Sequence, residues 1–96
     1  MLKLIRSAKA ELDLIDIWLY IAADQPTNAD RFLDKLSKAA ASLAETPGMG
    51  VERPEIFEGL KSFPVDRYII YYRVKETHLE IVRVLSSARD INHIDW

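Results

Sequence analysis

The spacing of apolar residues changes halfway along the chain, and this change limits the possible folds more than any other feature. Up to residue 45, apolar side chains recur every three or four positions, which is the period of an amphipathic α-helix. From residue 59 onward, β-branched and aromatic residues form the short runs that are typical of strands. A chain of 96 residues has room for one compact domain. The sequence therefore predicts a single α+β domain over residues 1–96.

Two helices are predicted in the first half of the chain. The first covers residues 8–24, with Ser7 as its N-cap, because a serine hydroxyl can accept a hydrogen bond from an unpaired backbone N–H. Pro26 ends this helix, since proline lacks an N–H and clashes with the preceding turn. Helical spacing then continues to residue 45. The short link predicts that the two helices form an antiparallel hairpin.

Four strands are predicted around this hairpin. A short one is expected at residues 2–5, and three more over residues 59–65, 67–74 and 79–87. Pro64 cannot donate to a ladder, so the end of its strand is expected at an edge or a bulge. The last of these strands alternates without interruption. We predict that the last three form an antiparallel meander, with the helices on one sheet face and the other face uncovered.

The first predicted helix carries more apolar residues than one buried face requires. They form one stripe of Ala8, Leu12, Ile15, Leu19 and Ala22, and a neighbouring stripe of Leu14, Ile17, Trp18 and Ile21. Either the whole helix is well packed, or one stripe meets a partner. We expect that Leu14, Trp18 and Ile21 bind a partner segment, together with Arg73 on the sheet, because Trp and Arg are enriched in binding hot spots.

Arginines lie within or beside the predicted core strands. If strand pairing places Arg83 near Arg73, these two side chains and Arg67 line the sheet face that the helices leave uncovered. In one interpretation each arginine pairs with a carboxylate, for which the candidates are Glu58, Glu80 and Asp90. In the other, the arginines form a surface that accepts an anionic partner. The sequence leaves both interpretations open.

The sequence has no pattern for metal or nucleophilic catalysis. There are no cysteines, which excludes thiol chemistry and cysteine zinc sites. The only histidines are His78, in a predicted turn, and His93, near the end of the chain. We therefore predict no catalytic residue, no metal site and no cofactor.

Charge and hydropathy limit the possible partners and location. The net charge of −2 argues against a nucleic-acid grip over the whole surface, so we expect no specific nucleic-acid binding by this chain. No window is apolar over about 18 residues, and the start has no secretory pattern. With no cysteines, the chain suits a reducing compartment. We expect a cytoplasmic protein without a membrane segment.

Five short patterns, in order over nearly the whole chain, resemble the ParE branch of the ParE/RelE toxin superfamily. The residues that carry the resemblance are Asp13, Leu14, Ile17, Tyr20 and Ile21, then Pro47 and Gly50, then Gly59, Leu60, Lys61 and Ser62, then Tyr72 and Arg73, and finally Ile81, Arg83, Val84, Leu85, Arg89, Asp90 and Ile91. No single pattern is specific, but five in register are.

The resemblance implies the RelE/ParE-like fold and a toxin of a type II toxin–antitoxin module. ParE-like toxins inhibit DNA gyrase and are neutralised by a ParD-like antitoxin, whose flexible C-terminal segment wraps the toxin. The partner segment expected at Leu14, Trp18, Ile21 and Arg73 is then the antitoxin, bound as a helix in a groove and as an added strand.

Two other functions stay open at this point. RelE-like relatives cut mRNA on the ribosome and tend to carry a His or Tyr after the last strand. His93 lies in that region, so the alternative function is a ribosome-dependent endoribonuclease. The remaining possibility is an inert family member that is retained for regulation.

The end of the chain, residues 88–96, has an apolar Trp96 at a position that normally frays. Either this tail is pinned back on the domain, or it forms part of a surface that faces gyrase, where the resemblance places importance. We expect the second arrangement, in which the tail can be deleted without unfolding the domain. The predicted target-binding residues are Arg83, Arg89, Ile91, His93, Ile94 and Trp96.

Overall fold

The computed structural model describes all residues, 1–96. Its elements, in order, are β1 (Lys3–Arg6), α1 (Ala8–Ala22), α2 (Pro26–Glu45), η1 (Pro47–Met49), β2 (Val51–Glu52), β3 (Leu60–Val65), β4 (Tyr68–Val74), β5 (His78–Ser86) and η2 (Ile91–His93), where η1 and η2 are single 3-10 turns. The predicted α+β order is therefore confirmed. The two-residue strand β2 was not predicted.

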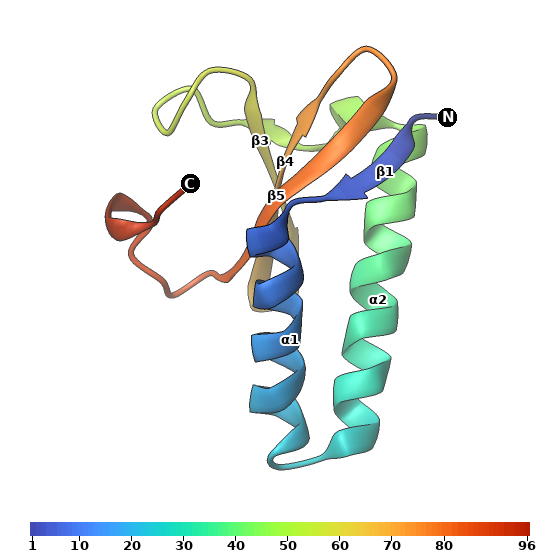
Figure 1. Cartoon of the computed structure of the whole chain (residues 1–96), viewed down its shortest axis with the longest axis vertical. Helices are drawn as coiled ribbons and strands as arrows, with labels where there is room; N and C mark the ends of the chain where they lie inside the picture. Colours follow the sequence, from blue (N-terminus) through green and yellow to red (C-terminus); the bar gives the residue numbers. More distant parts are fainter.

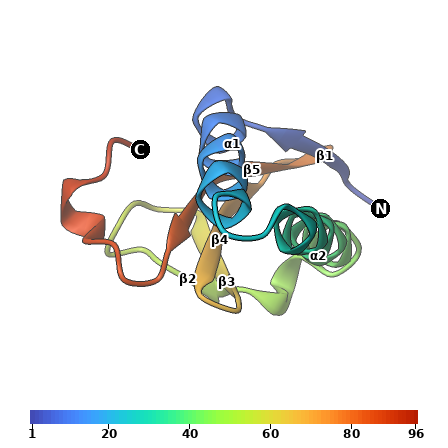
Figure 2. The ribbon, with the colours of Figure 1, turned by 90° about the horizontal axis from the view of Figure 1, so that it is seen from below.

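The five strands form one mixed sheet in the order β1-β5-β4-β3-β2. Strands β3, β4 and β5 form the predicted antiparallel meander, while β1 returns to pair in parallel with β5 at the other edge. The helical hairpin covers one face of this sheet, as predicted (Figure 1, Figure 2). Pro64 lies beyond the two residue pairs that join β3 to β2, so its missing N–H faces no strand.

Ser7 links the start of α1 to the edge of β5. Its Oγ accepts a hydrogen bond from the backbone N–H of Ala10 at 2.9 Å, which confirms the predicted N-cap. The same hydroxyl donates to the carbonyl of Val82 at 2.7 Å. The parallel pairing of β1 stops at Ile81, so α1 begins where β5 loses its neighbouring strand.

Strand β5 contains a β-bulge, so its predicted uninterrupted alternation is wrong. Tyr72 pairs with Ile81 but Tyr71 pairs with Arg83, which leaves Val82 as an extra residue in β5. As a result Ile81 and Val84, which are three residues apart, both pack in the core on the helix side of the sheet, while Val82 and Leu85 pack in a second cluster. The bulge changes the direction of the side chain of Arg83.

The second face of the sheet is not uncovered, which corrects another expectation. A buried cluster occupies it, made of Leu60, Tyr71, Val82 and Leu85. The residues that pack over this cluster come from the loop before β3, from β4 and from the C-terminal tail, namely Ile56, Phe57, Ile69, Ile91, Ile94 and Trp96. The domain therefore has two apolar layers, one under the helices and one under the tail.

Candidate functional site

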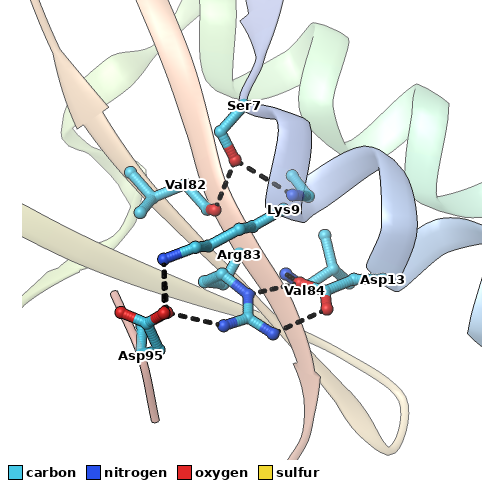
Figure 3. Close-up of polar contacts among 8 residues, drawn as sticks. Ser7, Lys9, Asp13, Val82, Arg83, Val84 and Asp95 are labelled. Carbon is cyan, nitrogen blue, oxygen red and sulfur yellow. Dashed lines mark hydrogen bonds and ion pairs between the residues drawn. The ribbon is translucent and has the colours of Figure 1, made fainter.

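The buried ion pair between Asp13 and Arg83 joins α1 to β5. Arg83 donates from Nε to Asp13 Oδ2 at 2.7 Å and from Nη2 to Oδ1 at 2.8 Å, a bidentate geometry (Figure 3). The backbone N–H of Val84 donates to Asp13 Oδ2 at 3.0 Å. Asp13 thus accepts a hydrogen bond from a backbone N–H of β5 at a position beyond the end of β1, where no strand is present to pair with it. Asp13 is 7% exposed and Arg83 is 9% exposed.

The electrostatics of this pair follow from its hydrogen bonds. The hydrogen bonds to Asp13 raise the pKa of Arg83 above its ordinary value, and burial opposes this effect without cancelling it. Arg83 is therefore a fixed cation inside the domain. Its third nitrogen, Nη1, donates to the backbone carbonyl of Asp95 at 2.9 Å.

The C-terminal tail is anchored to the domain at Asp95 and Trp96. Lys9 of α1 lies 3.0 Å from a carboxylate oxygen of Asp95 and donates to its backbone carbonyl at 3.3 Å. Beside this anchor, the Trp96 ring makes edge contacts with Tyr71, at a centroid distance of 4.9 Å, and with Phe57, at 6.2 Å. The tail is thus a strap across the second sheet face, fixed by one polar anchor and one aromatic anchor.

Between these anchors and β5, the tail presents polar side chains to solvent. Asp90 caps the turn η2 by accepting from the N–H of Asn92 at 3.0 Å. The ring of His93 is 83% exposed and lies 3.4 Å from the carboxylate of Asp90. Arg89 is also exposed and has no carboxylate within ion-pair distance. We call the exposed residues Arg89, Asn92 and His93 the tail tip.

The six predicted target-binding residues divide into two groups. Ile91, Ile94 and Trp96 are half-buried in the second apolar cluster, and Arg83 is buried beneath the tail. Only Arg89 and His93 are fully exposed. The structure therefore brings the six residues together, with four of them as the support and two at the surface.

The predicted row of three arginines on one open sheet face is wrong. Arg83 is diverted to Asp13 by the bulge, and Arg73 pairs across β4 and β5 with Glu80. The expectation of carboxylate pairing is correct for Arg73, whose partner was among the candidates. Asp13 was not a candidate, because it lies 70 residues from Arg83 in a predicted helix.

Three of the predicted antitoxin-binding residues lie together in the helical layer. Leu14 lines an apolar cavity of about 260 Å³ between the helices and β1, which Leu4, Leu33 and Leu36 also line. Ile21 lines a more open cleft of about 890 Å³ near the end of the hairpin. Trp18 is half-buried, and its Nε1 donates to Asp30 at 2.8 Å.

Arg73 does not join this group. It follows Tyr72, whose side chain packs in the core on the helix side, so alternation places Arg73 on the opposite sheet face. A partner would have to wrap around the domain to reach all four residues. The most exposed aliphatic residues of α1 are instead in the other stripe, at Leu12, Ile15 and Leu19.

The loop after α2 is fixed by the hydroxyl of Tyr72. This fully buried side chain donates to the carbonyl of Pro47 at 2.7 Å and accepts from the N–H of Gly50 at 3.0 Å. A Cβ at Gly50 would collide with the Tyr72 hydroxyl and lie 2.8 Å from the backbone oxygen of Ser62. Three positions that carried the family resemblance are thus one structural unit.

We expect Gly50→Ala to lower the free energy of unfolding by about 2–4 kcal/mol, because it overpacks a rigid site and breaks a buried hydrogen bond. Urea denaturation of the purified protein measures this loss. Gly48→Ala is the matched control, since a Cβ at Gly48 has no atom within 4 Å. Equal effects of the two substitutions would contradict this account of the loop.

We expect stability to fall above about pH 10. Burial raises the pKa of Tyr68, Tyr71 and Tyr72 above the ordinary value of 10.0. The unfolded chain then loses these protons at a lower pH than the folded protein, so the tyrosine contribution to stability is complete below pH 10 and is lost as pH rises through the folded pKa values. Urea denaturation across this range, with phenolate absorbance as a second signal, measures the effect. In Tyr72→Phe the fall should be shallower, and an unchanged slope would contradict the role of Tyr72.

Two further observations concern metal ligands and membrane-spanning helices. No three His, Asp or Glu side chains lie close enough together to hold a metal ion. Neither helix combines the length and the apolar character needed to cross a membrane.

Comparison with known proteins gives three concordant matches. Residues 4–91 match the family described as the ParE toxin of the type II toxin–antitoxin system parDE. The chain is 34% identical over 89 residues to Toxin ParE1 of Caulobacter vibrioides, and the match covers 90% of this chain and 88% of that protein. In the solved structure of a chromosomal ParDE system from P. aeruginosa, one chain superposes with a TM-score of 0.75 at 22% identity, which covers 90% of this chain and 96% of that one.

Proposed function

The chain belongs to the ParE toxin family of type II toxin–antitoxin systems, and from this premise we propose that it inhibits DNA gyrase and is neutralised by a ParD-like antitoxin. In this proposal the tail tip makes the contact with gyrase. The antitoxin binds the helical layer, where Leu14, Trp18 and Ile21 lie, and extends to Arg73. The chain then acts by binding, without a catalytic residue of its own.

The observation that carries the gyrase proposal is the anchored tail. A C-terminal segment normally frays, and here two side chains of the folded domain, Lys9 and Arg83, hold the backbone of Asp95. The Trp96 ring fixes the same segment from the other side. These anchors fix the backbone of the segment that carries Arg89 and His93, so less backbone freedom is lost when a target binds.

Two features support the proposed antitoxin site. The cavity beside Leu14 is lined by eight hydrophobic residues among ten, which suits the apolar face of a helix. Strand β1 is the edge of the sheet and pairs on one side only, with β5. Its free side offers backbone groups to an added strand. A segment that fills the cavity passes next to this edge, because Leu4 and Arg6 of β1 line the same cavity.

The endoribonuclease alternative receives less support from the side chains. Cleavage at a 2′-hydroxyl needs cations near the developing phosphorane charge and a general acid and base. Arg73 and Arg83 are held by Glu80 and Asp13 within the domain. The second sheet face, where such cations were expected, holds the apolar cluster under the tail instead.

A supercoiling assay with purified gyrase tests the proposal. The full-length chain should inhibit supercoiling, and an equimolar amount of a ParD-like antitoxin that binds it should restore activity. A parallel reaction with translating ribosomes and mRNA tests the alternative. Cleaved mRNA together with unaffected gyrase would overturn the proposal in favour of the endoribonuclease.

A further inference from the structure

The side of α1 that faces away from the sheet carries an apolar seam. Leu12 is 62% exposed, and Ile15 and Leu19 are each 56% exposed. The side chains buried on this helix are on the other side, at Ala10, Asp13 and Ile17. Figure 2 shows no other element beyond the outer side of α1. The seam is therefore unpartnered within the domain, and it does not line the cavity assigned to the antitoxin.

The spacing of the seam is that of a coiled coil. Its members are Ala8, Leu12, Ile15, Leu19 and Ala22, so the intervals are four, three, four and three residues. This strict repeat of 3.5 residues is the pattern with which one helix packs against another by knobs into holes. A helix that only covers a sheet has no need of such a repeat on its solvent side.

The charges beside the seam indicate the partner and its direction. On one flank lie Lys9 and Asp16, each directly after a seam position, and on the other flank lies Glu11. In a parallel pair of identical helices, Glu11 of each copy would face Asp16 of the other, which is repulsive. In an antiparallel pair, Lys9 of each copy faces Asp16 of the other, so one two-fold axis produces two attractive ion pairs.

We propose that two copies of this chain associate through α1 in an antiparallel arrangement. Leu12 of one copy packs against Ile15 of the other, and Leu19 packs against Ala8, so four seam layers are filled and Ala22 lies beyond the overlap. Lys9 can leave Asp95 and pair with Asp16 of the other copy at little cost. Its present pair with Asp95 lies at the surface, where the Asp95 side chain is 91% exposed. The seam residues do not line the cavity assigned to the antitoxin. When Lys9 changes partner, Arg83 still holds the backbone carbonyl of Asp95.

The length of the helix sets the strength of the association. Helix α1 has 15 residues, which corresponds to about 22 Å at 1.5 Å per residue. Two heptads with alanine at both ends bury less apolar surface than a stable obligate dimer does. We therefore expect a reversible monomer–dimer equilibrium that depends on protein concentration.

Sedimentation equilibrium of the purified chain and of charge variants tests the proposal. Asp16→Lys and Lys9→Asp each place like charges across the axis twice, so either variant alone should dissociate at least about tenfold more readily than the wild type. An equimolar mixture of the two single variants should associate again, because every cross-pair is then attractive. The double variant K9D/D16K should also recover the dimer.

Control measurements distinguish a loss of association at the seam from the effects of unfolding or of a change in net charge. Circular dichroism verifies that each variant is folded. Glu45→Lys makes the same change of charge as Asp16→Lys, at an exposed position at the end of α2, and should leave the monomer–dimer equilibrium unchanged. Ile15→Glu should abolish association. A wild-type chain that stays monomeric at hundreds of micromolar, or a mixture that does not associate, would overturn the proposal.

Discussion

Asp13→Ala is expected to lower the free energy of unfolding by about 3–5 kcal/mol, because it leaves a buried guanidinium without its counter-charge. The substitution removes both carboxylate acceptors of Arg83 and the acceptor of the Val84 N–H. Arg83 is 9% exposed, so water cannot replace them without opening the domain. Urea denaturation followed by circular dichroism measures the loss, and a loss below about 1 kcal/mol would contradict a structural role for the pair.

A double-mutant cycle separates the interaction energy of the Asp13–Arg83 pair from the contribution of each residue alone. Arg83→Met should cost nearly as much as Asp13→Ala, since it leaves a buried carboxylate unpaired. The combined variant D13A/R83M removes both charges and should recover much of the loss, because neither buried charge is then left without its partner. Arg73→Met is the matched control. Its pair with Glu80 is more exposed, so it should cost about 1 kcal/mol or less.

The overall architecture was predictable because local patterns specify it. The change from helical to strand spacing predicts the order of elements, and Ser7 and Pro26 have the side chains that start and end helices. Strand β2 has only two residues and gives no pattern of its own. The bulge at Val82 also escaped prediction, since valine suits a regular strand and a bulge equally well.

The Asp13–Arg83 pair was missed because the spacing of apolar residues predicts only contacts between residues that are close in the sequence. An aspartate between Leu12 and Leu14 is consistent with a solvated helix position, and only the fold brings it to β5. A usable signal was present, since both residues belong to the patterns that carry the family resemblance. When two such patterns each contain a charged residue of opposite sign, one in a helix and one in a core strand, the two residues are candidates for a buried ion pair.

The apolar residues of α1 show a second limit of sequence interpretation. Two stripes were recognised, but spacing alone does not say which stripe faces the sheet. Asp13 and Ile17 decide this in the structure, because the ion pair with Arg83 and the core contacts fix the rotation of the helix. The stripe of Leu12, Ile15 and Leu19 is thereby turned to solvent.

The tail tip is expected to decide gyrase inhibition separately from folding. The double variant R89A/H93A should change the free energy of unfolding by less than about 0.5 kcal/mol, because both side chains are exposed. It should bind the antitoxin as the wild type does, since the proposed antitoxin site lies in the helical layer. Its inhibition of gyrase should fall at least about tenfold, because the side chains that face the target are missing. A supercoiling assay, a binding titration with antitoxin and urea denaturation measure the three quantities.

Deletion of residues 92–96 is expected to abolish gyrase inhibition and leave a folded domain that still binds antitoxin. The deletion removes the Trp96 ring from Tyr71 and Phe57 and the Asp95 carbonyl from Lys9 and Arg83, so we expect it to lower the free energy of unfolding by about 2–4 kcal/mol. Trp96→Ala is the control that separates this loss from the target contact, because it removes the aromatic anchor and keeps Arg89 and His93. If inhibition follows stability across all three variants, the tail is only a structural strap. A deleted chain that inhibits purified gyrase at the concentration of the full-length chain would show that the target surface lies elsewhere.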